Sequence, residues 1–375
     1  MRYAMIMAGG AGTRLWPMSR KNKPKQLLPF ITRPGDDKPR SLLELAAARL
    51  EGLVEPDRRY ICTSEAYREP IRQSLPQFTN DRILGEPVGR DTINAVGFAA
   101  AVFAKQDPDA VFAVLTADHI IEPDDIFQQR IEVGFRLVEA DPSRLVTFSI
   151  TPTYAATGYG YVERGRPIHG IEGCMVNDQP IAFEVARFVE KPDKHRAEVY
   201  VNSGMFGWNS GMFVYNAQTF LNCLKRFKPE NYEGLMKIQE AWGTDAQQQV
   251  LEEIYPTLPK TSVDYGIMEP ASTDRQVSIA AVMMDVNWLD VGSWPSYAQT
   301  LEPDEAGNRL TGQGKSLIVD GKNNLIVNTD PDHTITILSA ENLIVIRTKD
   351  ATLVMPADKA EQLKELYENV DESLK

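Results

Sequence analysis

The first 150 residues alternate short apolar runs with amphipathic segments, and this alternation limits the possible fold more than any other feature of the chain. Apolar runs bounded by turn residues predict buried strands, and apolar residues repeated every three or four positions predict helices. Strands are expected at 3–8, 59–63, 82–85, 110–115 and 144–150, and helices at 41–53, 65–75, 92–106 and 124–140. Such alternation indicates right-handed βαβ units. The sequence therefore predicts a Rossmann-like α/β fold, with a mainly parallel sheet and helices on both faces.

The pattern changes after residue 150 and again near residue 300. Further strands are expected at 182–189, 205–215 and 277–286, and helical structure at 217–255 with a break at Pro229. Short β runs then recur at 316–319, 324–328, 334–338, 342–347 and 351–355, and a helix is expected at 358–370. Repeated short strands predict a small β coil. The 375 residues are thus expected to form two domains, 1–298 and 299–375.

Composition and charge exclude several classes of protein. The chain is 43% hydrophobic and 25% charged, with a net charge of −12. These fractions are typical of a globular protein and disfavour disordered or fibrous structure. An acidic chain of this kind is a poor binder of nucleic acid or of an anionic membrane. Neither nucleic acid nor a membrane is therefore an expected partner.

The cysteines and the apolar runs bear on the compartment. Cys62, Cys174 and Cys223 are far apart and odd in number, which disfavours a disulfide framework and favours a reducing compartment. No apolar run reaches the ~18 residues of a membrane helix. Glycines and Arg14 interrupt the apolar start of the chain, which is unlike a signal peptide. The expected location is the cytoplasm.

A basic, glycine-rich segment stands at the beginning of this acidic chain. The first 35 residues carry seven Lys or Arg and no Asp or Glu. Such a run can be a solvated face, or it can bind a strongly anionic small molecule. Gly9, Gly10 and Gly12 follow the first expected strand, and glycines let backbone N–H groups approach a phosphate closely. The spacing is not that of a P-loop, and Leu15 stands where a dinucleotide fingerprint needs its third glycine.

Read as one motif, the segment Gly-Gly-Ala-Gly-Thr-Arg-Leu-Trp-Pro-Met-Ser-Arg at 9–20, followed by Pro-Lys-Gln-Leu at 24–27, resembles the nucleotidyltransferases that make sugar nucleotides. The Leu-Trp-Pro-x-Ser-Arg part, at 15–20, is similar to the mannose-1-phosphate guanylyltransferase family (GDP-mannose pyrophosphorylases). Further segments agree in the family's order, at 86–92, 115–119, 188–192, 208–213, 262–265 and 288–294. The last 75 residues resemble the family's short left-handed β-helix.

The chain departs from the family's usual residues at four positions, which are Leu27, Asp91, Thr116 and Gly266. Asp91 stands where the family usually has Asn, and this change could alter contacts to the base or the ribose.

The resemblance implies transfer of GMP from GTP to mannose 1-phosphate, giving GDP-mannose and pyrophosphate. Because the attacking phosphate oxygen is already anionic, the reaction needs charge neutralisation and positioning and no general base. The residues implied for the triphosphate are Gly9, Gly10, Gly12 and Thr13, with Arg14 and Lys25 as catalytic cations. Arginine gives a planar fork and lysine a point charge.

Asp118 and Asp290 are the Mg²⁺ ligands by resemblance, and both are implied to be catalytic. Mg²⁺ is usually held by one or two carboxylates together with phosphate oxygens. Read alone, either aspartate could instead be a turn residue or a helix cap. The four histidines show no zinc spacing, and His119, beside Asp118, is expected to be structural.

The base and the sugar have their own implied residues. Glu86 could accept guanine N1–H and N2–H₂ with its carboxylate, although a surface glutamate before a proline is the alternative. Arg90 and Thr92 belong to the same nucleotide-binding loop. The residues implied for the sugar phosphate are Gly160, Glu190, Lys191 and Asn209. Asn209 could also be a plain turn residue, and Trp16 and Trp294 are expected to pack in the core.

Other functions remain open at this stage. A non-catalytic GDP-mannose sensor would be expected to lose Arg14, Lys25, Asp118 or Asp290, and all four are present. A thymidylyl- or uridylyltransferase is disfavoured by Glu86, and another guanylated sugar is not excluded. The β coil is too small to bury its own apolar residues, so it must pack on the α/β domain, on a second copy of the chain, or on both. A homodimer in which it takes part is expected. Its role in the chemistry is expected to be indirect.

Overall fold

The computed structural model describes residues 1–10, 12–33 and 35–375, and these form two compact units. Unit 1 comprises Met1–Gly9, Ala46–Ala117 and Ile121–Trp288, and unit 2 comprises Gly10–Leu45, Asp118–Ile120 and Leu289–Lys375. The units cut across the division at residue 298 that the sequence suggests, because the basic N-terminal segment belongs with the C-terminal part of the chain.

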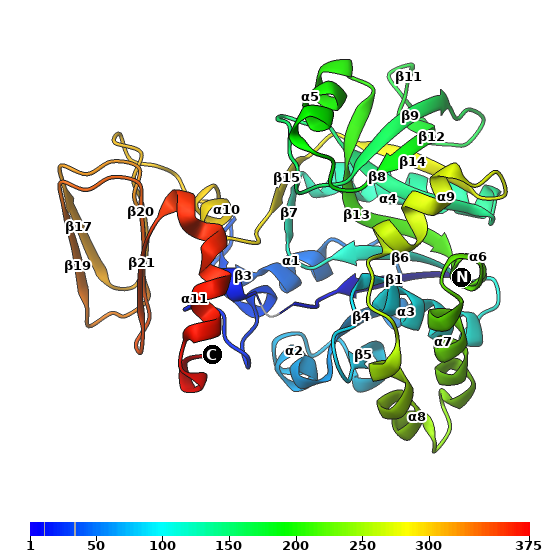
Figure 1. The fold of residues 1–375 in the computed structure, drawn as a ribbon, viewed down its shortest axis with the longest axis horizontal. Helices are drawn as coiled ribbons and strands as arrows, with labels where there is room; N and C mark the ends of the chain where they lie inside the picture. The colour runs from blue at the N-terminus through cyan, green and yellow to red at the C-terminus, as the bar shows by residue number, and fades with distance from the viewer. Residues whose placement is uncertain (11, 34) are drawn as a thin grey trace. The chain divides into compact units, whose positions relative to one another are not determined.

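Within the described residues, unit 1 is built on a nine-stranded sheet in the order β5-β4-β1-β6-β13-β8-β14-β12-β9 (Figure 1). Its strands are β1 (Arg2–Met7), β4 (Arg59–Ser64), β5 (Ile83–Glu86), β6 (Val111–Thr116), β8 (Arg144–Ile150), β9 (Tyr161–Pro167), β12 (Ala182–Val189), β13 (Phe206–Asn216) and β14 (Ser278–Met284). A small hairpin, β10 (Met175–Val176) with β11 (Gln179–Pro180), lies between β9 and β12 in the chain.

The sheet is mixed, and all of its strands except β12 and β13 run in one direction, in agreement with the expectation of a mainly parallel sheet. β5, β4, β1 and β6 are parallel neighbours, as are β8 and β14. β13 runs antiparallel to both β6 and β8, and β12 runs antiparallel to β14 and β9. The antiparallel β9–β12 pair needs no crossover helix. β12 therefore runs opposite to β9. α5 connects β12 to β13, and β13 runs in the same direction as β12.

Most helices of unit 1 lie within the ranges expected from the sequence, whereas α5 and α9 were not expected. They are α2 (Arg68–Ser74), α3 (Thr92–Gln106), α4 (Asp124–Ala140), α5 (Lys194–Ser203), α6 (Ala217–Phe227), α7 (Pro229–Ala241), α8 (Gln247–Ile254) and α9 (Glu269–Thr273). The expected ranges of α3 and α4 are confirmed, and Pro229 begins α7 as the second of the helices expected within 217–255.

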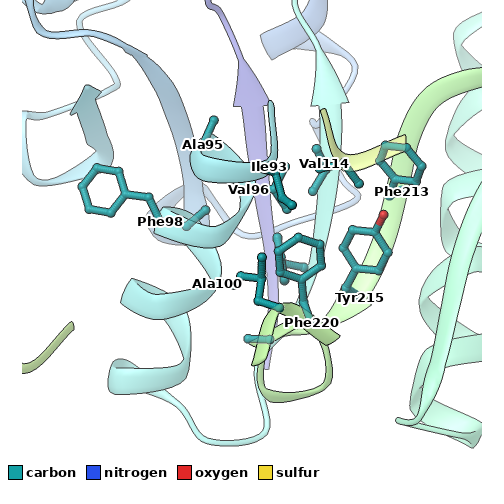
Figure 2. Close-up of a cluster of buried hydrophobic side chains, with 14 of the residues drawn as sticks. Ile93, Ala95, Val96, Phe98, Ala100, Val114, Phe213, Tyr215 and Phe220 are labelled. Carbon is teal, nitrogen blue, oxygen red and sulfur yellow. The ribbon is translucent and has the colours of Figure 1, made fainter. Parts of the chain in front are cut away.

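The main core of unit 1 lies between α3, α6 and the sheet. α3 is buried along most of its length, since its alanines allow close approach to the strands. Figure 2 shows side chains of α3 and Phe220 of α6 gathered with Val114 of β6 and with Phe213 and Tyr215 of β13. This packing fixes the ends of β5, β6 and β13, from which several of the implied site residues project.

Unit 2 contains a β coil and the basic segment. Its coil strands are β16 (Arg309–Gly312), β17 (Lys315–Val319), β18 (Leu325–Asn328), β19 (Thr334–Leu338), β20 (Leu343–Arg347) and β21 (Thr352–Pro356). β16, β18 and β20 are parallel neighbours, β17 and β19 form a second parallel pair, and β21 is antiparallel to β20 (Figure 1). The repeated parallel coils confirm the β-helix-like domain expected from the sequence.

The remaining elements of unit 2 surround its core, and three of them extend into unit 1. They are β2 (Pro29–Ile31), β3 (Arg40–Ser41), α1 (Leu42–Ala48), β7 (His119–Glu122), β15 (Asn287–Asp290), α10 (Trp294–Ala298) and α11 (Leu363–Asn369). Short 3₁₀ turns at Thr13–Leu15, Lys25–Leu27 and Ala357–Gln362 complete it. The helix expected at 358–370 is therefore a 3₁₀ turn followed by α11.

The two ends of the chain share one core in unit 2. Leu15, Trp16 and Leu42 pack in the same buried cluster as Trp294, Leu353 and Leu363. The indole Nε1 of Trp294 also donates a hydrogen bond to the carbonyl of Trp16 at 2.9 Å. The expectation that Trp16 and Trp294 are core residues is confirmed, and this packing explains why Gly10–Leu45 belongs to unit 2.

Two sequence expectations concern the chain as a whole. The described residues include no helix with enough length and apolar character to cross a membrane. Cys62, Cys174 and Cys223 are all free thiols and all buried. Burial raises the pKa of each thiol, which makes them inert packing residues.

Candidate active site

The glycine loop of unit 2 is shaped by the lysine that follows it. Gly12 has φ of +63°, and a Cβ there would lie 2.7 Å from Cβ of Lys25. Any other residue would push Lys25 away, so the position requires glycine. The carbonyl of Gly12 accepts a hydrogen bond from Ser19 Oγ at 2.7 Å. Gly10 also has positive φ, while Ala11 of the same motif lies outside the described residues.

Lys25 is buried and points at Asp118. Its Nζ lies 2.7 Å from Oδ2 of Asp118. Burial alone would raise the pKa of the Asp118 carboxyl, but the charges of Lys25 and His119 and the hydrogen bonds from Lys25 and the backbone together outweigh burial and lower that pKa to about 2. Asp118 is therefore an anion at neutral pH, as a metal ligand must be.

Asp118, His119 and Asp290 together form a group that can hold a metal ion. One donor atom from each residue lies within 4.8 Å of the others. Asp118 and His119 come at the start of β7 and Asp290 at the end of β15, and these strands pair with each other. The backbone N–H of Val291 donates to the carbonyl of Asp118 at 3.0 Å. Two carboxylates fit Mg²⁺, and the imidazole adds a nitrogen donor that the sequence analysis assigned to structure.

Arg14 lies beside this group. A Cβ on Gly292 would be 3.2 Å from Nη2 of Arg14 and 3.2 Å from Oδ1 of Asp290, so the guanidinium and that carboxylate approach each other over a glycine. On its other side, Nη1 of Arg14 is paired with Glu361, a residue that the sequence analysis did not single out. Unit 2 thus brings the two implied cations and the two implied metal ligands together.

In unit 1, Glu86 ends β5 and is only 7% exposed. The Tyr255 hydroxyl donates to its Oε1 at 2.6 Å. Burial raises the pKa of Glu86, while the hydrogen bonds from Tyr255 and from the backbone of Arg90 oppose this rise. Each carboxylate oxygen has two lone pairs, so Glu86 keeps acceptor capacity beside Tyr255. Tyr255 was missed because it lies 169 positions away in the chain.

The loop after Glu86 leads into α3. Asp91 adopts φ of +67° and caps the helix, with its Oδ1 accepting from the backbone N–H of Thr92 at 2.7 Å. The Thr92 hydroxyl accepts from the backbone N–H of Val263 at 2.9 Å. Both residues therefore have structural roles in this loop. Arg90 is half-buried at its start, and its Nε has no hydrogen-bond partner among the described residues.

The four residues implied for the sugar phosphate meet in unit 1. A Cβ on Gly160 would lie 2.4 Å from Oε2 of Glu190 and 3.2 Å from Cβ of Asn209, so only glycine fits between them. The backbone N–H of Asn209 donates to the Gly160 carbonyl at 2.8 Å. Nζ of Lys191 pairs with Oε1 of Glu190 at 2.6 Å.

Asp264 and Thr147 support this cluster, and neither was assigned a role from the sequence. Thr147 Oγ1 donates to Oδ1 of Asn209 at 2.8 Å, and Nδ2 of Asn209 donates to Oδ1 of Asp264 at 2.7 Å. Burial and the charge of Glu190 raise the pKa of Asp264 to about 6. Oε2 of Glu190 is buried, with no hydrogen-bond partner among the residues that the structure describes. A polar group left in this state is suited to a ligand hydroxyl.

Known proteins resemble this chain in sequence and in fold. Residues 3–307 match the nucleotidyl transferase family, and residues 314–370 match the MannoseP isomerase/GMP-like beta-helix domain. A mannose-1-phosphate guanylyltransferase of Klebsiella pneumoniae is 36% identical, over 98% of this chain and 74% of its own length. One of Escherichia coli is 35% identical, again over 98% of this chain and 74% of its own length.

A solved structure covers both units. A protein of Thermus thermophilus, described as a mannose-1-phosphate geranyltransferase, superposes with a TM-score of 0.81 and 29% identity over 98% of each chain. The sequence matches extend through every segment that carries an implied site residue. The chain belongs to the nucleotidyl transferase family of enzymes, among the mannose-1-phosphate guanylyltransferases.

Proposed function

We propose that the protein transfers GMP from GTP to mannose 1-phosphate, forming GDP-mannose and pyrophosphate. The observation that carries this proposal is the grouping in unit 2 of Lys25 and Arg14 with the carboxylates of Asp118 and Asp290. Two cations beside two metal-binding carboxylates suit a reaction between polyanions. The same four residues disfavour a non-catalytic sensor.

The cations of unit 2 would neutralise the triphosphate. Lys25 is held at Asp118 by a charged hydrogen bond, so its Nζ is fixed in place before a substrate arrives. Arg14 presents a planar fork beside Asp290. Asp118 and Asp290 would hold Mg²⁺, which supplies charge neutralisation at the phosphate oxygens. The oxygen of the sugar phosphate attacks the α-phosphorus of GTP, and pyrophosphate leaves.

The residues of unit 1 would select the substrates. Glu86 can accept from the N1–H and N2–H₂ groups of guanine, whereas adenine offers no such pair of donors. Asn209 has a fixed orientation, because Thr147 donates to its oxygen and Asp264 accepts from its nitrogen. In this proposal Asn209 and Glu190 would bind sugar hydroxyls, and Lys191 would bind the 1-phosphate.

A pyrophosphate-release assay over a panel of substrates tests this function. The panel pairs GTP, ATP, UTP and dTTP with the 1-phosphates of mannose, glucose and fucose. We expect the highest kcat/KM with GTP and mannose 1-phosphate, and loss of turnover in excess EDTA. Asp118→Ala and Asp290→Ala should each lower kcat by about 10²-fold or more. Binding of GDP-mannose without any turnover would favour the sensor, and full activity in EDTA would exclude the metal.

A further inference from the structure

Glu361 lies at the guanidinium of Arg14, although 347 positions separate the two residues in the chain. Its Oε1 and Oε2 accept hydrogen bonds from Nη1 of Arg14 at 2.9 and 3.0 Å. Both carboxylate oxygens therefore use one corner of the fork. Nη2 lies on the side of Gly292, 3.2 Å from where a Cβ on that glycine would stand.

Packing fixes both partners of this ion pair. Leu15, next to Arg14, belongs to the buried cluster of unit 2 that also contains Ala360 and Leu363. These two residues flank Glu361 in the 3₁₀ turn and at the start of α11. An exposed ion pair contributes little to stability by itself. Here buried neighbours fix the backbone on both sides of the pair, while the side chains of Arg14 and Glu361 themselves are 40% and 77% exposed.

The C-terminal segment is also bound to the residues that follow Arg14. Nε1 of Trp16 donates to the carbonyl of Leu374 at 2.9 Å, and Nη2 of Arg20 donates to Oδ1 of Asp350 at 2.7 Å. Lys21 pairs with Glu372. Residues 350–375 therefore hold the basic segment at several points, and Glu361 is the point that reaches the implied catalytic arginine.

Asp290 is a second carboxylate within reach of Arg14. A free arginine side chain has several rotatable bonds, and at this site it would be drawn to Asp290 by charge. That contact would neutralise an implied metal ligand and turn the fork away from the phosphates. The hydrogen bonds from Nη1 to Glu361 oppose this movement.

We infer that Glu361 is a positioning residue for nucleotidyl transfer, a role that rests on the proposed function. It orients the Nη2 and Nε edge of Arg14 toward the triphosphate and so stabilises the transition state. Its negative charge, however, weakens the attraction between Arg14 and the incoming nucleotide. Loss of Glu361 should therefore lower kcat through the first effect, while the second effect keeps KM for GTP equal or lowers it. A purely structural role would not give this combination.

Steady-state kinetics on the full chain test the inference, with GTP varied at saturating mannose 1-phosphate. Glu361→Ala should lower kcat roughly tenfold, while KM for GTP stays equal or falls. In the Arg14→Ala background, Glu361→Ala should cause no further loss, because its target is gone. Glu365→Gln is the matched control, since Glu365 is exposed on α11 of the same segment, and it should leave both constants unchanged.

The outcomes distinguish a failure of the positioning role from a failure of the proposed function. An unchanged kcat in Glu361→Ala, a rise in KM without loss of kcat, or an equal loss in the Arg14→Ala background would each overturn the positioning role. The double-variant comparison also covers partial unfolding, since a loss of fold would persist without Arg14. A wild-type chain that releases no pyrophosphate from GTP and mannose 1-phosphate would refute the proposed function and the inference together.

Discussion

At the scale of single residues, the implied site residues of each unit have polar neighbours that set their protonation or their direction. Lys25 holds Asp118 as an anion, Tyr255 orients Glu86, and Asp264 orients Asn209. In each case the supporting partner lies far away in the sequence. The resemblance to a family identified Glu86 and Asn209, but only the fold could identify their partners, Tyr255 and Asp264.

Glu86 is the residue on which base selection depends in the proposed function. Glu86→Gln keeps the shape of the side chain but places a donor opposite the guanine N–H groups. We expect a loss of about 2–4 kcal/mol in discrimination between GTP and ATP, measured as the ratio of their kcat/KM values. Tyr255→Phe is the control, because it removes the hydroxyl at Oε1 and leaves the carboxylate. An unchanged GTP/ATP ratio in Glu86→Gln would show that Glu86 is only a structural acceptor for Tyr255.

The raised pKa of Asp264 predicts that the free energy of unfolding depends on pH. Its pKa is raised to about 6 by burial and by Glu190, so the folded state keeps a proton that the unfolded state releases at about pH 4. The contribution of protonated Asp264 to the free energy of unfolding is therefore fully present below about pH 4. It is lost as the pH rises through about 6. Asp264→Asn removes this ionisation and keeps an oxygen that can accept from Asn209.

We expect Asp264→Asn to gain up to about 2 kcal/mol in free energy of unfolding, relative to wild type, between pH 4 and pH 7. Denaturant unfolding at several pH values measures the difference. Asp245→Asn, at an exposed carboxyl, should show no such trend. A stability difference that does not change with pH would mean that Asp264 has no raised pKa.

At the scale of elements, helices with strong local signals could be predicted, and elements that depend on distant pairing could not. The ranges of α3, α4, β8 and β12 agree with the sequence analysis, because their apolar periodicity and end signals are local. β7 and β15 were missed, since each has four residues and forms only by pairing with the other. The direction of β13 is also non-local, as it follows from the antiparallel β9–β12 pair.

α1 begins with a capping box formed by Ser41 and Glu44, a signal that is local in the sequence. The backbone N–H of Glu44 donates to Ser41 Oγ at 3.2 Å, and Oε2 of Glu44 accepts from the Ser41 N–H at 2.6 Å. Ser41→Ala should lower the free energy of unfolding by about 1 kcal/mol, because one buried N–H loses its partner. Thermal or denaturant unfolding measures this. Ser64→Ala is a suitable control, since Ser64 precedes a 3₁₀ turn without a side-chain cap, and a similar loss there would argue against the capping role.

At the scale of the whole molecule, the β coil is more closely tied to the site than the sequence suggested. Its segment contributes Leu353 and Leu363 to the core that holds Leu15 and Trp16, and Glu361 pairs with Arg14. A chain truncated after Ala298 is expected to lose catalysis, because its basic segment would lose both its packing and its ion pairs. The sequence could divide the chain into segments, but it could not show that the two ends share one compact unit.

The coil also presents an apolar face, and we propose that a second copy of the chain covers it. Leu317, Val319 and Leu338 project from β17 and β19 and are 55%, 50% and 74% exposed. Val319 and Leu338 are register partners on neighbouring strands, so they form a continuous surface. Side chains of this size are unusual on the solvent face of a small parallel sheet, and contiguous apolar patches mark interaction sites. A flat sheet face can pair with its own copy about a two-fold axis.

The prediction is a homodimer that dissociates when charge is placed on this face. Sedimentation velocity of the wild-type chain should give a dimer, and the double variant Val319→Lys, Leu338→Lys should give a folded monomer, because two buried charges per subunit would lack partners. Val199→Lys is the matched control, since Val199 is 51% exposed on α5 of unit 1, and it should remain a dimer. A wild-type chain that is monomeric at all concentrations would refute the dimer. A dimer that survives the double variant would place the interface elsewhere. Turnover of the monomeric variant should stay close to that of wild type, since none of the residues assigned to the reaction lies on β17 or β19.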